Sequence, residues 1–183
     1  MNLKKIINKI FLSLLIIIIM SKRNPLIIKD IVGGFKEPTK YFSYTIYKNF
    51  EYLSNAPIMH HNLEEIDKLL KSENMYCFLV YDTKNIIIGY LIGEIIKLSD
   101  NRMVFFINYL YVFSKYRKMG IGSKLINLVK SKIEKWKING IMTLCDTSID
   151  AIVDFYAKKN FIIDPVYKRN DRYEILSWFK NKK

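Results

Sequence analysis

The most specific chemistry in the sequence lies in one run of residues, Arg117-Lys118-Met119-Gly120-Ile121-Gly122. This run joins a strand-like stretch, Phe105 to Phe113, to a helix-like stretch, Ile121 to Trp136. Its two glycines let the backbone approach an anion and direct successive amide groups at it, and the following helix adds the positive end of its dipole. Arg117 and Lys118 add mobile positive charge at the same point. The run therefore predicts a cradle for a pyrophosphate group.

Glycine-rich loops also bind dinucleotides and nucleoside triphosphates, but the spacing here fits neither. No third glycine completes a Rossmann fingerprint, and no Gly-Lys-Ser/Thr completes a phosphate loop. An ordinary strand-to-helix turn is the remaining alternative, because glycines serve that role as well.

The segment Tyr116 to Gly122, with Leu110 and Val112 upstream and Leu125 downstream, resembles the acyl-CoA signature of the GNAT N-acetyltransferase superfamily, Arg/Gln-x-x-Gly-x-Gly/Ala. The resemblance implies that backbone amides of this loop bind the pyrophosphate of coenzyme A. It also implies that the strand before the loop offers unpaired backbone groups to the pantetheine arm, and that the amide of Leu110 stabilises the tetrahedral oxyanion. The expected cofactor-binding residues are Leu110, Val112, Arg117, Lys118, Met119, Gly120, Ile121, Gly122 and Ser123.

A second stretch, Asp154 to Phe161, resembles the other signature of that superfamily, Phe-Tyr-x-Lys-x-Gly-Phe. It places Tyr156 where a tyrosine commonly protonates the departing CoA thiolate, and a phenol with a pKa of about 10 can make that transfer. The alternative is a core tyrosine that only packs its helix. Asn160 replaces the usual glycine and tolerates the same left-handed cap, whereas Ile149 replaces a common asparagine.

The general base is the part of the site that the sequence does not identify. Several members of the superfamily carry a glutamate early in the splayed strand, a stretch that contains Asn108 here. The amine could instead lose its proton through water to Tyr109, Glu94 or backbone carbonyls. His60 and His61 are a further option, because imidazole has a suitable pKa, and His61 is the candidate catalytic residue. Tandem histidines in a loop are more often plain surface residues.

The resemblance implies an acetyl-CoA-dependent N-acetyltransferase that moves an acetyl group to a primary amine by direct transfer, with acetyl-CoA as cosubstrate and no metal. The acceptor stays open between a protein amino terminus, a lysine side chain, a polyamine and a small metabolite. Two other classes also stay open, a non-catalytic acyl-CoA-binding module and a basic nucleic-acid-binding protein.

The composition fits one folded domain, since the 183 residues are 50% hydrophobic and 14% aromatic. The net charge of +13 suits a polyanion, but most of the 30 basic residues are lysine, whereas bidentate readout of phosphates and bases favours arginine. Nucleic acid is therefore not the expected partner. Cys77 and Cys145 are expected to be reduced and buried. A run of lysines on the long helix is expected to form a solvated face, namely Lys130, Lys132, Lys135 and Lys137.

Residues 1–24 form a hydrophobic N-terminal segment that differs from the predicted acetyltransferase domain, residues 25–183. Its apolar run, Ile10 to Met20, would reach only about 16 Å as a helix, against a hydrocarbon core of about 30 Å. An uncleaved anchor, a signal-like or interfacial helix, and a true start at Met20 stay open as interpretations. The expected localisation is cytoplasmic, with membrane contact through residues 3–20 if the segment is kept.

The helices and strands expected to position these residues indicate an α/β (α+β) fold class. The resemblance implies the GNAT fold, a mixed, mostly antiparallel sheet of about seven strands flanked by four helices. The pattern runs β, α, α, β, β, β, α, β, α, β, β over about residues 40–179, with the first core strand at Tyr41 to Tyr47, where aromatic and β-branched residues crowd. Asn62 is expected to cap the second helix, and Thr147 or Ser148 the helix that bears Tyr156. The other predicted strands are Met75–Tyr81, Ile86–Leu98, Arg102–Phe113, Ile141–Cys145, Phe161–Asp164 and Tyr173–Trp178.

Overall fold

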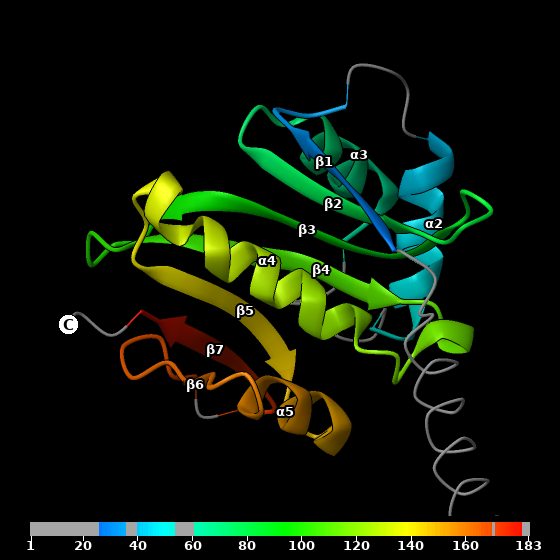
Figure 1. The fold of residues 1–183 in the computed structure, drawn as a ribbon. Coiled ribbons are helices and arrows are strands. Elements are labelled where there is room, and N and C mark those ends of the chain that lie inside the picture. Colours follow the sequence, from blue (N-terminus) through cyan, green and yellow to red (C-terminus); the bar gives the residue numbers. More distant parts are fainter. Residues whose placement is uncertain (1–25, 36–39, 54–60, 170, 181–183) are drawn as a thin grey trace, which may run out of the picture.

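One mixed sheet of seven strands forms the centre of the protein (Figure 1). The structure is a computed structural model, which describes residues 26–35, 40–53, 61–169 and 171–180. The strands lie in the order β1-β2-β3-β4-β5-β7-β6, and every neighbouring pair is antiparallel except β4 with β5. Their bounds are β1 Ile27–Val32, β2 Met75–Tyr81, β3 Ile87–Lys97, β4 Met103–Val112, β5 Gly140–Asp146, β6 Ile162–Ile163 and β7 Tyr173–Phe179.

Two helices cover each face of the sheet (Figure 1). On one face α2 and α3 bury an apolar cluster, and on the other face α4 and α5 bury a second one. The helices are α2 Lys40–Phe50, α3 Leu63–Lys71, α4 Ile121–Trp136 and α5 Asp150–Ala157, and two 3-10 turns span Glu51–Leu53 and Ser114–Tyr116. The predicted fold class, a mixed sheet of seven strands with four helices in the described part of the chain, is confirmed.

The first predicted strand is wrong, because Tyr41 to Tyr47 lies in α2. Ser43 and Ile46 are its buried residues, and this spacing of three is helical. Burial against α3 and the sheet therefore outweighs the strand preference of aromatic and β-branched side chains, which depends on context. The preceding segment, Ile27–Val32, supplies the first strand instead and pairs with β2 along its whole length. The predicted order of elements is correct from α3 onward, whereas the strand before the helices lies at Ile27–Val32 and not at Tyr41 to Tyr47.

The helix caps show one correct and one wrong prediction. Asn62 caps α3 as predicted, because its side chain accepts from the Glu65 amide at 2.9 Å while the Glu65 carboxylate accepts from the Asn62 amide at 2.9 Å. Neither predicted residue caps α5, whose N-cap is Ile149 with no side-chain bond. The Ser148 hydroxyl donates instead to the buried carboxylate of Asp146 at 2.6 Å, which satisfies a charged group that would otherwise be costly to bury.

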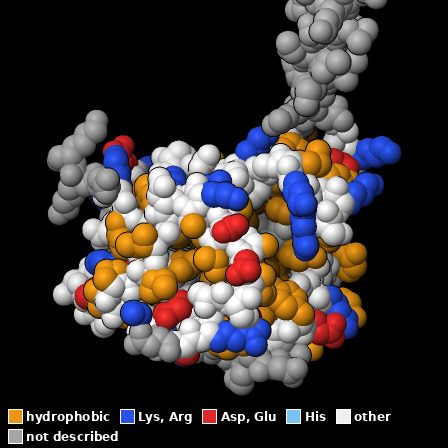
Figure 2. Space-filling view, turned by 90° about the horizontal axis from the view of Figure 1, so that it is seen from below, with side chains coloured by type: hydrophobic (Ala, Val, Ile, Leu, Met, Phe, Trp, Pro, Cys, Tyr) orange, Lys and Arg blue, Asp and Glu red, His pale blue; other side chains and the backbone are white. Residues whose placement is uncertain are grey.

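Two of the four lysines expected to form a solvated face, three on α4 and Lys137 at its C-cap, make specific contacts instead. Lys130 donates to the carbonyl of Lys159 at 2.6 Å and lies 4.1 Å from the ring centre of Trp178. Lys132 forms an ion pair with Asp30 at 2.8 Å. On the face seen in Figure 2, basic side chains are separated by acidic and hydrophobic ones, so this face carries no continuous basic surface.

The predicted N-terminal segment, residues 1–24, lies outside the described residues, and so does the membrane contact predicted for residues 3–20. Among the helices that the structure describes, none has both the length and the hydropathy needed to cross a membrane. The boundary expected at residue 25 stays a prediction.

Candidate active site

The site begins where the two central parallel strands separate. β4 and β5 pair from Val104 with Gly140 to Ile107 with Thr143, and their pairing ends there. Beyond this point β4 stays with β3 as far as Val112, whereas β5 stays with β7. The two strands diverge toward their C-terminal ends (Figure 1). Their facing edges are therefore left without ladder partners, and the sheet opens between them.

A β-bulge in β4 coincides with this opening. Ile92 of β3 pairs with Tyr109 and Gly93 pairs with Ile107, so Asn108 is the extra residue. A bulge changes which face the following side chains occupy. Before the bulge Ile107 packs with the α4 cluster, whereas after it Tyr109 packs with the α2 and α3 cluster.

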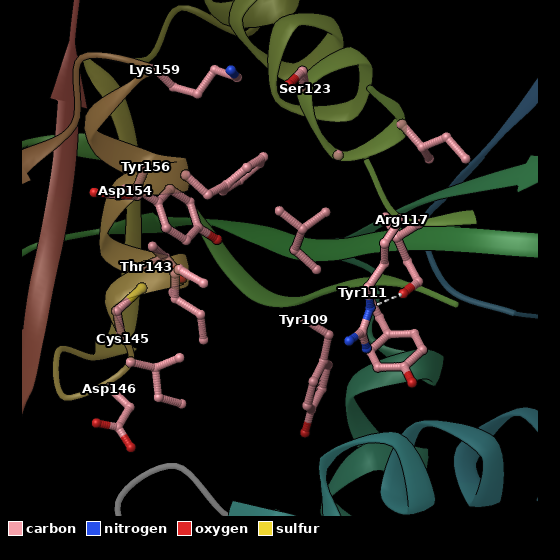
Figure 3. A pocket seen from close by; sticks show the side chains of 18 of the residues that line it. Tyr109, Tyr111, Arg117, Ser123, Thr143, Cys145, Asp146, Asp154, Tyr156 and Lys159 are labelled. Carbon is pink, nitrogen blue, oxygen red and sulfur yellow. Dashed lines mark hydrogen bonds between the residues drawn. The ribbon is translucent and has the colours of Figure 1, made fainter. Parts of the chain in front are cut away.

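A cleft of about 1200 Å³ fills the opening, which is ample for a cofactor-sized ligand. Leu110 and Val112, which line it, pack with the α4 cluster, whereas Tyr109 and Tyr111 pack with the α2 and α3 cluster. The cleft therefore connects the two faces of the sheet. Figure 3 shows Tyr109 and Tyr111 on one side of β4, and Tyr156 and Ser123 on the other.

The loop from Arg117 to Gly122 forms one end of the cleft. Lys118 and Gly120 are in the left-handed region, with φ of 62° and 79°, and Gly120 is the N-cap of α4. The amide of Lys124 makes the bond to the Gly120 carbonyl at 3.0 Å. The amides of residues 121–123 precede this bond and have no acceptor within the helix. They form, with the helix dipole, a positively polarised end suited to an anion.

Gly122 lies in close contact with α5. A Cβ built on it would be 3.2 Å from two ring atoms of Phe155, which also lines the cleft. Within the described part of the chain, no atom beyond the adjacent backbone lies within 4 Å of a Cβ built on Gly120, where the constraint is the positive φ. A side chain at position 122 would thus press on the opposite wall of the cleft.

Arg117 is fixed to the end of β4. Its Nε donates to the carbonyl of Val112 at 3.0 Å, and its guanidinium lies 5.5 Å from the ring centre of Tyr111 (Figure 3). Arg117 and Lys118 line one side of the cleft, and Lys158 and Lys159 line the other. Basic side chains therefore line both sides of the cleft.

Tyr156 projects from α5 into the cleft (Figure 3). Its ring is 6% exposed and packs edge-on against Phe155 and Phe161, with ring centres 5.1 Å apart in each pair. Burial raises the pKa of Tyr156 well above its usual value, although a hydrogen bond with Thr143 acts in the opposite direction. The hydroxyl is therefore protonated at neutral pH and can donate.

The lining includes several residues that sequence reasoning missed. Asp146, at the end of β5, is buried and forms an ion pair with Arg172 at 2.6 Å, and this interaction with Arg172 lowers the pKa of Asp146 to about 2. Burial raises the pKa of the Cys145 thiol to about 12. Cys145 and Asp146 end the strand that follows the long helix, and this end faces the opening. That position in the sequence was the signal that could have identified them as lining residues. Further lining residues of this kind lie on β4, β5 and α5, and with these two the set is Asn108, Tyr111, Thr143, Cys145, Asp146 and Phe155.

Most of the predicted site residues come together in the cleft. The two that do not line it are Met119, whose side chain is 55% exposed, and His61. His61 reaches the site indirectly, since its Nδ1 forms a hydrogen bond with the hydroxyl of Tyr109. His60 lies outside the described residues. No three His, Cys, Asp or Glu side chains of the described ranges are grouped as a metal site.

Comparisons with known proteins agree with this geometry. No curated protein matches the sequence. Solved structures share the fold: NAA60 from Arabidopsis thaliana in complex with acetyl-CoA is 14% identical, with a TM-score of 0.59, covering 85% of this chain and 98% of that chain. The NatC complex bound to Gag peptide and CoA is 19% identical, with a TM-score of 0.58, and the match covers 83% of this chain and 95% of that chain. An aminoglycoside acetyltransferase, meta-AAC0020, from an uncultured soil metagenomic sample is 20% identical, with a TM-score of 0.57. The match covers 88% of this chain and 99% of that chain.

A family model described as an acetyltransferase (GNAT) domain matches residues 73–163. The matched segment runs from β2 to β6 and contains the opening between β4 and β5, the glycine loop and Tyr156. The resemblance seen in the sequence is thereby confirmed, and the chain belongs to the GNAT family of acetyltransferases.

Proposed function

We propose that this protein transfers the acetyl group of acetyl-CoA directly to a primary amine. The observation that carries the proposal is the opening between β4 and β5, with the amide-lined start of α4 at one end and Tyr156 beside it. An acyl-transfer site needs an anion cradle, a donor for the oxyanion and a proton for the leaving group. The cleft offers all three within one cavity.

The residues of the loop fit the pyrophosphate of coenzyme A. The amides of residues 121–123 would bind it, Arg117 and Lys118 would add charge, and the glycine at 122 leaves the room that a side chain would fill. The free edge of β4 at Leu110 and Val112 would pair with the amide groups of the pantetheine arm, as an added strand does. Met119 would contribute through its backbone, because its side chain is exposed.

The catalytic chemistry is assigned to two groups of the chain. The amide of Leu110 would stabilise the oxyanion of the tetrahedral intermediate. The Tyr156 hydroxyl would donate a proton to the departing thiolate, which its place in the cleft and its protonated state at neutral pH support. Direct transfer is favoured over an acyl-cysteine, because Cys145 is a neutral thiol at pH 7 and the thiolate is the nucleophilic form.

The acceptor would enter from the face covered by α2 and α3. This side of the cleft carries Tyr109 and Tyr111, with Phe50 at the end of α2. The acidic residues among the described lining residues, Asp146 and Asp154, each have a basic neighbour, at 2.6 Å and 4.0 Å. An aromatic wall without unpaired acids suits a single amine, such as that of a peptide, better than a polycation.

The test follows thiol release from acetyl-CoA in the presence of peptides, alkylamines, polyamines and aminoglycosides. We expect at least one monoamine or peptide to accelerate thiol release. The same compound should gain about 42 Da, the mass added when an acetyl group replaces a hydrogen. CoA binding without acceleration by any amine would show a non-catalytic acyl-CoA-binding module. DNA binding that weakens with salt, without affinity for CoA, would show a nucleic-acid-binding protein.

We also propose that residues 25–183 form the catalytic domain, because β1 begins at Ile27 and pairs fully with β2, and β7 ends at Phe179. A chain that starts at Met20 should bind acetyl-CoA as tightly as the full chain. Weaker binding by the shorter chain would contradict this boundary.

A further inference from the structure

We propose that Tyr109 and His61 form a proton relay that removes the proton of the acceptor amine. This inference rests on the proposed function and deepens it, because it assigns the general base of the same site. Tyr109 belongs to the cleft wall, and His61 lies 48 positions away in the chain, in the segment before α3.

The contact between the two side chains is direct. The Tyr109 hydroxyl is hydrogen bonded to Nδ1 of His61, and their rings meet edge-on with centres 5.5 Å apart. Tyr109 lines the cleft and is 3% exposed, whereas His61 is only partly buried and does not line it. A proton that enters at Tyr109 can therefore leave the cleft at His61.

The position of Tyr109 suits this task. It immediately precedes Leu110, whose amide is the proposed oxyanion donor, and its side chain lies on the opposite face of the sheet from that of Leu110. The bulge at Asn108 puts Tyr109 on the α2 and α3 face, since without it Tyr109 would share the face of Ile107. The relay thus starts on the acceptor side of the cleft, next to the place where the thioester carbonyl would lie.

The position of His61 is fixed by the start of α3. The next residue, Asn62, exchanges two hydrogen bonds with Glu65, each 2.9 Å, and these hold the chain entering the helix. Phe50 of α2 packs against the Tyr109 ring with centres 5.1 Å apart. Both members of the pair are therefore held before any ligand binds.

The groups around the pair favour a relay over a tyrosinate base. Burial raises the pKa of Tyr109 well above its usual value, and the nearby Tyr90 from β3 and Glu65 from α3 act in the same direction. The hydroxyl therefore stays protonated and can pass a proton only by receiving another.

The step balances in atoms and charge. The ammonium of the acceptor gives one proton to the Tyr109 oxygen as the original hydroxyl proton moves to Nδ1 of His61, which leaves a neutral amine and an imidazolium. The amine nitrogen then forms the C–N bond, the C–S bond breaks, and Tyr156 gives its proton to the thiolate. The second amine proton passes to the Tyr156 oxygen and restores the phenol. His61 returns its proton to solvent, so one proton is released for each acetyl group transferred.

The first test compares pH profiles of kcat/KM for the best monoamine acceptor. In His61→Gln the side chain can still accept a hydrogen bond but cannot take a proton. We therefore expect kcat/KM at pH 7 to fall about 100-fold. The loss should shrink toward about pH 10, because the free amine is then already deprotonated in solution. Tyr109→Phe should behave alike, and acetyl-CoA affinity should be unchanged in both. Tyr81→Phe, which removes another hydroxyl packed against the same cluster outside the cleft, should keep the wild-type profile.

The second test measures the nitrogen chemical shifts of the His61 imidazole and needs no turnover. The chain has two histidines, so His60→Gln leaves His61 as a single imidazole signal. We expect its ring nitrogen shifts to change on Tyr109→Phe and to stay the same on Tyr81→Phe. A profile of His61→Gln equal to wild type, a uniform loss at every pH, or unchanged nitrogen shifts would overturn the relay. Selective loss at pH 7 in Glu94→Gln, with His61→Gln unaffected, would assign the base to Glu94 instead.

These outcomes are distinct from failure of the proposed function. That failure would appear in the wild-type protein, as absent acetyl-CoA binding or absent amine acetylation. Failure of the relay would appear as an active wild-type enzyme whose activity does not depend on His61.

Discussion

The hydroxyl of Thr143 donates to the carbonyl of Ile107 at 3.2 Å, and these are the last two residues that pair β5 with β4. This bond closes the parallel ladder at the point where the cleft begins. Thr143 also lines the cleft, as Tyr156 does, and its side chain acts against burial on the pKa of Tyr156. The residue that closes the ladder therefore lies beside the proposed proton donor.

Thr143→Val should destabilise the protein by about 1 kcal/mol, since it keeps the shape of the side chain but leaves the Ile107 carbonyl without this donor. Urea unfolding measures the difference. Thr45→Val is the matched control, because the exposed Thr45 hydroxyl bonds only within its own helix, and it should change stability little. Equal effects of the two substitutions would argue against a role for Thr143 at the end of the ladder.

Gly122→Asp should abolish CoA binding by placing bulk and negative charge at the amide cradle. Gly122→Asn has the same size without the charge and should retain weak binding. Because an acidic residue in the first turn favours a helix, loss of binding by the aspartate variant should occur without loss of helical structure. Calorimetric titration and circular dichroism measure both quantities. Wild-type affinity in Gly122→Asp would show that the cradle lies elsewhere.

Tyr156→Phe should slow turnover by up to about 100-fold while leaving acetyl-CoA affinity nearly unchanged, as expected when a single proton donor is lost. Phenylalanine keeps the ring contacts with Phe155 and Phe161, so stability should change little. Steady-state rates and titration of the same preparations separate the two effects. An unchanged kcat would remove Tyr156 from the mechanism.

Asp146→Asn should alter the dependence of stability on pH. The pKa of Asp146 in the folded protein is about 2, below the value of about 3.9 expected when unfolded, so its contribution is present above pH 4 and is lost as pH falls through 2. The variant should therefore be less stable than wild type at pH 7, and the two should converge near pH 2. Asp164 titrates in the same range but is present in both proteins, so the difference isolates Asp146. A gap that persists at pH 2 would contradict this assignment.

The sequence predicts the parts of the site that are local in the chain. The glycine loop, the α3 cap at Asn62 and the position of Tyr156 each follow from a few neighbouring residues, and each lies where it was expected. The helix over Tyr41 to Tyr47 was missed because its aromatic residues also suit a strand, and only burial decides between the two.

The remaining features depend on contacts between distant segments. The pair of Tyr109 and His61 is separated by 48 residues, and that of Asp146 and Arg172 by 26, so no local pattern brings them together. The bulge at Asn108 inverts the alternation of β4, which a strict period of two cannot represent. The wall on the acceptor side was therefore beyond the reach of sequence patterns.

Titration of the wild-type protein with acetyl-CoA in a calorimeter tests the central claim most directly, with Gly122→Asp as the control. The cradle and the free edge of β4 predict saturable binding of one acetyl-CoA per chain, together with a rise in the unfolding temperature, and neither effect in the variant. Absence of heat and of any thermal shift with the wild-type protein would contradict the account.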